Sequence, residues 1–145
     1  MIAYFDTSAI IPLLIGEPTT GQCTRLWDDA PRIVCARLIY PEACAALARA
    51  SRMGRISPTQ EVAATAELDE LVAQIDFIEI TDDLTLSAGR LAQRFGLRGY
   101  DAVHLAAGIT IDDDEFVFVT GDAELANAAS ESGLAVAVPA APPTT

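Results

Sequence analysis

Five short apolar runs alternate with longer segments of helical periodicity, and this alternation constrains the fold more than any other feature of the chain. The runs are rich in β-branched and aromatic residues and cover residues 2–5, 32–35, 77–80, 116–119 and 135–138. Strands separated by helices pair in parallel, because each helix returns the chain to the same edge of the sheet. The sequence therefore predicts an α/β fold with a central, mostly parallel five-stranded sheet between two helical layers.

Seven segments with helical periodicity lie between or after these runs, and several have recognisable ends. They cover residues 7–15, 18–29, 37–53, 58–75, 82–95, 100–111 and 122–132. Ser57 is placed to cap one helix, with Pro58 at its first position and Gln60 able to complete a capping box. Thr81 precedes two acids that favour a helix start. Three glycines stand where helices are expected to end in a left-handed residue: Gly54, Gly96 and Gly133.

The composition predicts one compact domain. The chain has 145 residues, of which 51% are hydrophobic, and this is enough for a single full core. We expect the domain to cover residues 1–138 and the Pro-rich segment 139–145 to form a flexible tail. No apolar run approaches the ~20 residues that cross a bilayer, and the first residues do not resemble a signal peptide. We therefore expect a cytoplasmic protein without a membrane partner.

The counts of three residue types exclude several classes of site. The three cysteines, Cys23, Cys35 and Cys44, show no Cys-x-x-Cys spacing, so we expect buried, reduced thiols rather than a zinc site or a redox pair. The absence of lysine excludes a P-loop and a Schiff-base enzyme. His104 is the only histidine, which excludes mechanisms that need two.

Four acids stand where a strand gives way to a helix or in the first turns of a helix: Asp6, Glu42, Asp101 and Asp122. In a parallel sheet such positions gather at one edge, where these proteins bind ligands. Four negative charges brought together there would repel one another unless a cation joined them. Because all the donors are carboxylate oxygens, the expected cation is Mg²⁺ or Mn²⁺ rather than zinc. Such an ion supports the displacement of groups on phosphorus, so the four acids predict metal-dependent phosphate chemistry.

Each acid also has a structural explanation when it is considered alone. Asp6 and Asp122 are placed to cap the helices that follow them, and Glu42 and Asp101 are first-turn acids that a helix dipole favours. Their common edge of the sheet is what favours a joint site. Asp101 also opens an apolar helix, where a buried carboxylate needs a partner.

Three further polar residues lie near these acids. Ser8 and Thr120 are placed to hydrogen-bond the carboxylates or the scissile phosphate, and their positions are equally well explained as helix caps. His104 comes three residues after Asp101 and lies near the same helix face. A packed, hydrogen-bonded histidine explains its position better than a catalytic one.

The net charge of −12 argues against a nucleic-acid enzyme, because affinity for phosphates normally comes from basic side chains. The nine basic residues are all arginines, and two series stand out: Arg49, Arg52, Arg55 and Arg90, Arg94, Arg98. The second series repeats every four residues and would line one helix face. Solvated surface arginines are the commoner explanation for either series alone.

Four segments occur in an informative order. They are Tyr-Phe-Asp-Thr-Ser-Ala at the N-terminus, a Glu near the start of the helix after the second strand, Tyr-Asp-Ala-Val-His-Leu-Ala, and Val-Thr-Gly-Asp-Ala-Glu-Leu. In this order and over nearly the whole chain, they resemble a PIN-domain ribonuclease and, more narrowly, the VapC toxins of type II toxin–antitoxin systems. The resemblance implies a PIN-like three-layer α/β/α fold and an endoribonuclease that depends on Mg²⁺ or Mn²⁺.

The resemblance also assigns residues and partners. It implies that Asp6, Glu42, Asp101 and Asp122 occupy the family's acidic positions, with Asp6 and Asp101 as direct metal ligands. Glu42 and Asp122 would complete the site, one of them orienting the attacking water or acting through a bound water. The implied partners are an RNA substrate, a cognate VapB-type antitoxin and a second copy of the chain in a homodimer. An antitoxin tail that places a basic side chain in the acidic pocket suits the acidity of the chain.

One departure from the family pattern and two alternative functions complete the interpretation. Ala36 stands where these proteins often have a hydroxyl residue to start the helix that carries Glu42. One alternative is a non-catalytic PIN-like protein-interaction module, in which the acids serve only as caps. The other, a phosphatase with Asp6 as its nucleophile, is disfavoured because such enzymes need a second Asp two residues on and a Lys, whereas this chain has Ser8 and no Lys.

Overall fold

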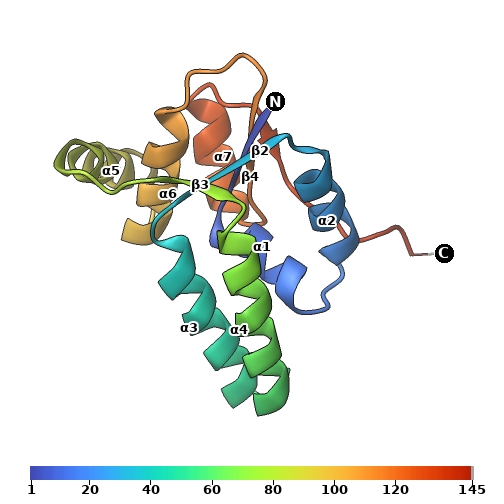
Figure 1. Cartoon of the computed structure of the whole chain (residues 1–145). Coiled ribbons are helices and arrows are strands. Elements are labelled where there is room, and N and C mark those ends of the chain that lie inside the picture. Colours follow the sequence, from blue (N-terminus) through green and yellow to red (C-terminus); the bar gives the residue numbers. More distant parts are fainter. Residues whose placement is uncertain (145) are drawn as a thin grey trace.

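A computed structural model describes residues 1–144 as five strands that alternate with seven helices (Figure 1). The strands are β1 (Ile2–Phe5), β2 (Arg32–Ala36), β3 (Ile75–Ile78), β4 (Phe116–Val119) and β5 (Val136–Ala137). The helices are α1 (Thr7–Leu14), α2 (Thr20–Asp29), α3 (Ile39–Arg52), α4 (Pro58–Val72), α5 (Asp82–Phe95), α6 (Gly99–Ile109) and α7 (Ala123–Glu131). Each expected helix and strand is present, with boundaries shifted by a few residues.

The strands form one sheet in the order β3-β2-β1-β4-β5, and all neighbours pair in parallel. The predicted five-stranded α/β sheet is therefore confirmed, and it is parallel throughout. From β1 the chain moves outward to β2 and β3, and then crosses to β4 on the other side of β1. The carboxyl ends of β1 and β4 thus flank the point where the strand order reverses, which is the usual place for a ligand site in an open parallel sheet.

Alternating side chains of the strands enter two separate cores, one on each face of the sheet. Tyr4 and Val34 join a cluster with residues of α5, α6 and α7. Phe5 and Cys35, which follow them directly in sequence, join a second cluster with residues of α1, α3 and α4. This two-residue alternation produces the three layers. Figure 1 shows α3 and α4 extending side by side beyond the sheet.

The third strand is the one element that was placed incorrectly. It covers Ile75–Ile78 rather than residues 77–80, and α4 accordingly ends at Val72. Ile75 is buried and pairs with Ile33 of β2. The charged residue Asp76 interrupts the apolar pattern by which the strand would be predicted. Because β3 is at the edge of the sheet, the Asp76 carboxylate can form an ion pair with Arg32 at 2.6 Å. An edge strand tolerates such a charge in solvent.

The predicted helix ends are confirmed. Ser57 and Gln60 form both hydrogen bonds of the capping box, and Thr81 caps α5 through the backbone N–H of Leu84. The three glycines that were expected in left-handed conformation have φ values of 74°, 64° and 89°: Gly54, Gly96 and Gly133. By contrast, Leu38 at the start of α3 provides no side-chain cap.

Two further observations bear on the expectations from composition. Cys23 and Cys35 are buried, Cys44 is partly buried, and all three are free thiols, as expected. Among residues 1–144, no helix has the length and apolar character required to cross a bilayer.

Candidate metal and active site

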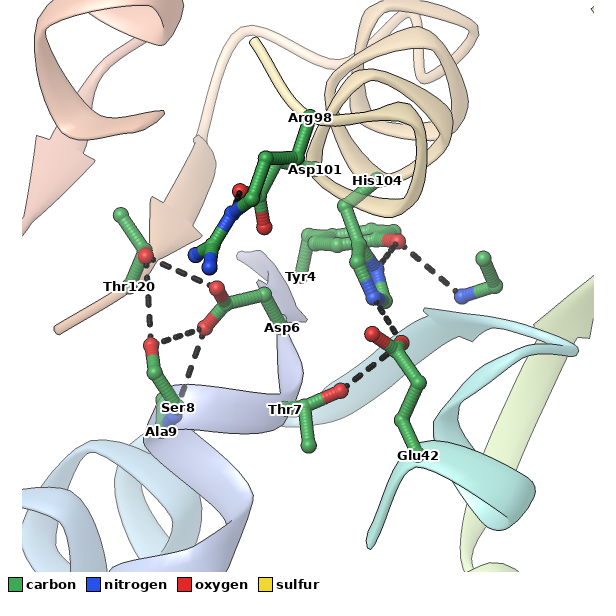
Figure 2. A network of polar contacts seen from close by, with 11 residues as sticks. Tyr4, Asp6, Thr7, Ser8, Ala9, Glu42, Arg98, Asp101, His104 and Thr120 are labelled. Carbon is green, nitrogen blue, oxygen red and sulfur yellow. Dashed lines mark hydrogen bonds and ion pairs between the residues drawn. The ribbon is translucent and has the colours of Figure 1, made fainter. Parts of the chain in front are cut away.

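Asp6 ends β1 and begins α1, and its carboxylate is held on both oxygens (Figure 2). Oδ1 accepts hydrogen bonds from the Ser8 hydroxyl at 2.7 Å and from the backbone N–H of Ala9 at 3.3 Å. Oδ2 accepts a hydrogen bond from the Thr120 hydroxyl at 2.9 Å. Asp6 is therefore the expected helix cap, and its carboxylate is also the group to which Ser8 and Thr120 make their expected hydrogen bonds.

The two hydroxyl groups connect the ends of β1 and β4. Ser8 Oγ accepts a hydrogen bond from the backbone N–H of Gly121 at 2.8 Å, and Thr120 Oγ1 accepts one from the N–H of Asp122 at 3.1 Å. Each hydroxyl has a single proton, and in both cases Asp6 is the acceptor that uses it. This accounting leaves Asp6 as an acceptor only, which is the role of an ionised carboxylate.

Burial opposes that ionised state. The Asp6 side chain is only 3% exposed, and burial raises the pKa of this carboxyl to about 6. The electrostatic influence of His104 and the hydrogen bonds from Ser8, Thr120 and Ala9 oppose the rise without cancelling it. A buried carboxylate with an elevated pKa is a group that gains from a nearby cation.

Glu42 lies in the first turn of α3, where its Oε1 atom accepts two hydrogen bonds. One comes from the Thr7 hydroxyl at 2.9 Å, and the other joins Oε1 to His104 Nε2 at 2.5 Å. Burial acts to raise the pKa of Glu42, but the contact with His104 and the hydrogen bond from Thr7 together lower it below its usual value. The folded protein therefore favours the ionised form of Glu42.

His104 is packed and hydrogen-bonded, as expected for the only histidine of the chain. It is 1% exposed and makes contacts through both ring nitrogens. Nδ1 lies 2.6 Å from the Tyr4 hydroxyl, which also accepts a hydrogen bond from the backbone N–H of Ala36 at 3.2 Å. His104 thus joins a buried residue of β1 to the acid on α3 (Figure 2).

Asp101 and Asp122 are brought together by an arginine. Arg98, the residue before α6, places Nε 3.2 Å from Asp101 Oδ2 and Nη2 3.6 Å from Asp122 Oδ2. Its side chain is 82% exposed. Asp122 also caps α7, because its Oδ1 accepts a hydrogen bond from the N–H of Leu125 at 3.0 Å. The guanidinium therefore supplies positive charge where the sequence predicts a cation.

The acids meet at one edge of the sheet without closing into a single cluster. Figure 2 shows the Asp6 carboxylate turned toward Ser8 and Thr120, the Glu42 carboxylate beside Thr7 and His104, and the Arg98 guanidinium beside Asp101. Among residues 1–144, no three His, Cys, Asp or Glu side chains lie close enough to hold one metal ion. The donors themselves fit an oxygen-ligated divalent cation, since all are carboxylates, one is buried with a raised pKa, and two already share a positive group. The assignment of the four acids as metal ligands stays a prediction.

A pocket of about 420 Å³ adjoins these acids. Glu42, Asp101, Arg49 and Arg98 line it together with Ala45, Ala46 and Tyr100. Each of the two arginine series noted in the sequence contributes one member, and α3 and the start of α6 supply them. Two acids and two arginines thus line the same pocket.

Sequence reasoning missed three contributors to this region. Thr7 and Tyr4 flank Asp6 within two residues, but their contacts with Glu42 and His104 cross elements that only the fold brings together. Arg98 precedes Asp101 by three residues, a spacing at which opposite charges on a helix commonly meet. That spacing was the one signal available for it.

Comparisons with known proteins agree with this architecture. A family model described as the PIN domain matches residues 3–131. The chain is 35% identical to ribonuclease VapC49 of Mycobacterium tuberculosis over 136 residues, which is 94% of each chain. It is 31% identical to ribonuclease VapC47 of the same species, and this match covers 95% of the chain and 97% of its relative.

The fold is also similar to that of solved structures. The crystal structure of Mycobacterium tuberculosis VapC20, a toxin that cleaves the sarcin–ricin loop, superposes with a TM-score of 0.70 at 22% identity and covers 94% of this chain and 99% of its own. VapBC2 of Rickettsia felis, solved with a DNA fragment from its promoter, gives a TM-score of 0.65 at 15% identity over 97% of this chain and 100% of its own.

Proposed function

Because the chain belongs to the VapC group of the PIN-domain family, we propose that it is an endoribonuclease toxin that depends on Mg²⁺ or Mn²⁺. The observation that carries the proposal is the position of Asp6. It is a buried carboxylate with a raised pKa at the point where the strand order reverses. Glu42 and Asp101 begin helices near the same edge, and Asp122 follows β4 and shares Arg98 with Asp101. A cation there would offset the cost of burying the negative charge of Asp6.

Each acid has a distinct part in the proposal. Asp6 and Asp101 would hold the cation directly, while Glu42 and Asp122 complete the site. When bound, the cation activates a water molecule and offsets charge at the scissile phosphate. Ser8 and Thr120 fix both oxygens of Asp6, so the carboxylate is oriented before any ligand arrives.

The arginines of the pocket supply the affinity for RNA that the overall charge of −12 opposes. Arg49 and Arg98 stand in the pocket wall beside Glu42 and Asp101. Contacts between guanidinium groups and phosphates would orient the RNA backbone along the pocket. The rest of the acidic surface disfavours other RNA contacts, so binding would depend on this limited basic wall and, with few phosphates neutralised, fall only moderately with salt.

The proposed partners are a VapB-type antitoxin and a second copy of the chain. A toxin–antitoxin complex from Klebsiella pneumoniae has a similar fold and supports the antitoxin as a partner. An acidic site is also a suitable receptor for a basic side chain of an antitoxin tail. Light scattering on the chain alone, and on the chain mixed with the antitoxin encoded beside it, measures both associations. A monomer that does not change mass in the mixture would contradict this part of the proposal.

A non-catalytic interaction module is the second candidate, and one observation favours it. Asp6 and Asp122 both serve as helix caps, and no three acidic or metal-binding side chains among the described residues are close enough to share a metal. Under this alternative the acids would be structural, and their replacement by asparagine, an equally good cap, would have little effect.

RNA cleavage separates the two candidates. We expect the wild type to cleave a structured RNA in the presence of Mg²⁺ or Mn²⁺, and we expect Asp6→Asn and Asp101→Asn to lose this activity. Asp82→Asn is the matched control, because Asp82 is an exposed first-turn acid on α5. Cleavage that persists in both site variants, or in excess chelator, would contradict a metal-dependent nuclease.

A further inference from the structure

We propose that His104 is a positioning residue: Tyr4 holds it in the form protonated on Nε2, and through Nε2–H it holds one oxygen of Glu42 so that the other faces the site. The inference rests on the proposed function for the role of Glu42. The hydrogen bonds that carry it do not depend on that function.

The direction of the Tyr4 hydrogen bonds is fixed by the number of protons. The Tyr4 hydroxyl is buried and accepts a hydrogen bond from the backbone N–H of Ala36 at 3.2 Å. A phenol carries its proton at neutral pH, and inside the core this proton needs an acceptor. The His104 Nδ1 atom, at 2.6 Å, is the partner that accepts that proton in a hydrogen bond.

The same accounting then fixes the histidine. A neutral imidazole whose Nδ1 accepts a hydrogen bond must have its proton on Nε2. Nε2 lies 2.5 Å from Glu42 Oε1, so the N–H donates to the carboxylate. The opposite tautomer would set a lone pair of Nε2 against the anionic oxygen and would leave the Tyr4 proton without an acceptor inside the core. The Nε2–H form satisfies all the groups at once.

The two carboxylate oxygens of Glu42 differ in their contacts. Both hydrogen bonds that the structure gives its side chain, from Thr7 and from His104, go to Oε1. Figure 2 shows the other oxygen on the side of Glu42 that faces Asp6. The carboxylate therefore has one oxygen held by the protein and one directed at the site, which is how supporting residues commonly orient a metal ligand.

This chain of contacts also explains how Glu42 is located although the start of α3 has no side-chain cap. Tyr4 comes from β1, Ala36 ends β2 and His104 comes from α6. The position of the Glu42 carboxylate is therefore set by contacts with the core of the sheet rather than by the first turn of its own helix. The Tyr4 ring is itself fixed by stacking on Phe118, with 4.9 Å between centroids and an interplanar angle of 4°. Its hydroxyl is consequently a rigid reference point.

Nitrogen-15 NMR tests the proposal directly, because the single histidine of the sequence gives one unambiguous imidazole. We expect a protonated Nε2 and an unprotonated Nδ1 at neutral pH. In Tyr4→Phe, which retains the stacked ring, we expect the Nδ1 resonance to shift, because the hydroxyl that donates to Nδ1 is removed. Tyr40→Phe is the matched control, because it removes an exposed phenol that bonds to Asp69. A ring protonated on Nδ1 in the wild type, whether neutral or cationic, or an Nδ1 resonance that does not change in Tyr4→Phe, would overturn the proposal.

Affinity for Mn²⁺, measured by calorimetry, tests the consequence for the site. Loss of a supporting hydrogen bond to a ligand typically weakens metal binding by about 10–100-fold. We expect a loss in this range for Tyr4→Phe and for His104→Ala, and partial recovery in His104→Gln, whose amide can donate to Glu42. Affinity unchanged in Tyr4→Phe would overturn the proposal even if His104→Ala does not fold. A wild type that binds no Mn²⁺ would instead contradict the proposed function, and the tautomer would still decide the arrangement of Tyr4 and His104.

Discussion

The candidate site has two halves that differ in how their acids are held. In the preorganised half, Asp6 and Glu42 are fixed by hydroxyl and imidazole groups from neighbouring elements. In the adjustable half, Asp101 and Asp122 are joined only by the solvent-exposed side chain of Arg98. Hydrogen bonds inside a protein hold geometry, whereas an exposed ion pair contributes little energy and rearranges easily. Under the proposed function, the first half would be preorganised for a cation, and the second half would rearrange around it.

The largest effect is expected from removing the preorganised ligand. Asp6→Asn keeps the helix cap but removes a charge, and the loss of several kcal/mol of stabilisation at a metal corresponds to a fall in RNA cleavage of roughly a hundredfold or more. Asp122→Asn, in the adjustable half, is expected to lose less. Single-turnover cleavage rates measure both. A greater loss in Asp122→Asn would reverse the assignment of the two halves.

The raised pKa of Asp6 gives a pH dependence of stability in the metal-free protein. The carboxyl titrates near 3.8 when unperturbed and at about 6 in the folded chain, so the folded state retains a proton that the unfolded state has lost between these values. Stability from this group is therefore present at low pH and lost as pH rises through about 6. Asp6→Asn lacks the effect.

Urea unfolding of the wild type and Asp6→Asn, each with chelator, measures this difference. From pH 4 to pH 7, we expect the stability of the variant relative to the wild type to increase by on the order of 2–3 kcal/mol. Mn²⁺ at pH 7 is expected to restore stability to the wild type alone. If the difference in free energy of unfolding between the variant and the wild type does not change with pH, then the pKa of Asp6 is not raised in the folded protein.

The hydroxyl support of Asp6 is expected to matter about tenfold. Thr120→Val removes the donor to Asp6 Oδ2 and the acceptor for the N–H of Asp122 while keeping the shape of the side chain. We expect Mn²⁺ affinity, measured by calorimetry, to fall by about tenfold. Thr85→Val is the control, because its hydroxyl bonds only to a backbone carbonyl on the exposed surface of α5. Equal affinities in the two variants would remove Thr120 from the preorganised half.

The smallest effect, and one of opposite sign, is expected for Arg98. Because its guanidinium lies between Asp101 and Asp122, it competes with a divalent cation for the same oxygens. Arg98→Gln is expected to raise Mn²⁺ affinity by up to about fivefold, the scale of an exposed ion pair, while weakening RNA binding. Arg90→Gln, at an exposed position of α5, serves as the control. Weaker Mn²⁺ binding in Arg98→Gln would mean that the arginine assembles the adjustable half instead of competing with the cation for it.

The sequence predicted the fold well because its signals were local. Alternating apolar runs, the Ser57 capping box and the left-handed glycines act within a few residues and were confirmed. The third strand was placed two residues too late because Asp76 interrupts its apolar pattern, and only the position of β3 at the edge of the sheet makes that charge acceptable.

The site was predictable in location but not in detail. The four acids were expected at the carboxyl edge of the sheet, and the strand order places the ends of β1 and β4 side by side there. The contact between His104 and Glu42 joins residues 62 positions apart, and Tyr4 meets His104 across 100 positions. Such pairs depend on how α3 and α6 pack against β1, which no local pattern encodes. The PIN-domain resemblance is confirmed by the family comparison, whereas the metal and the role of each acid remain proposals.

A calorimetric titration of the chain with Mn²⁺ near pH 6, in two buffers of different ionisation enthalpy, tests the central claim most directly. At this pH about half of the Asp6 carboxyls carry a proton. We predict saturable binding that releases protons in the wild type, and little binding and no such release in Asp6→Asn. The absence of binding at millimolar Mn²⁺, or binding identical in the two proteins, would contradict the account of these acids as a metal site.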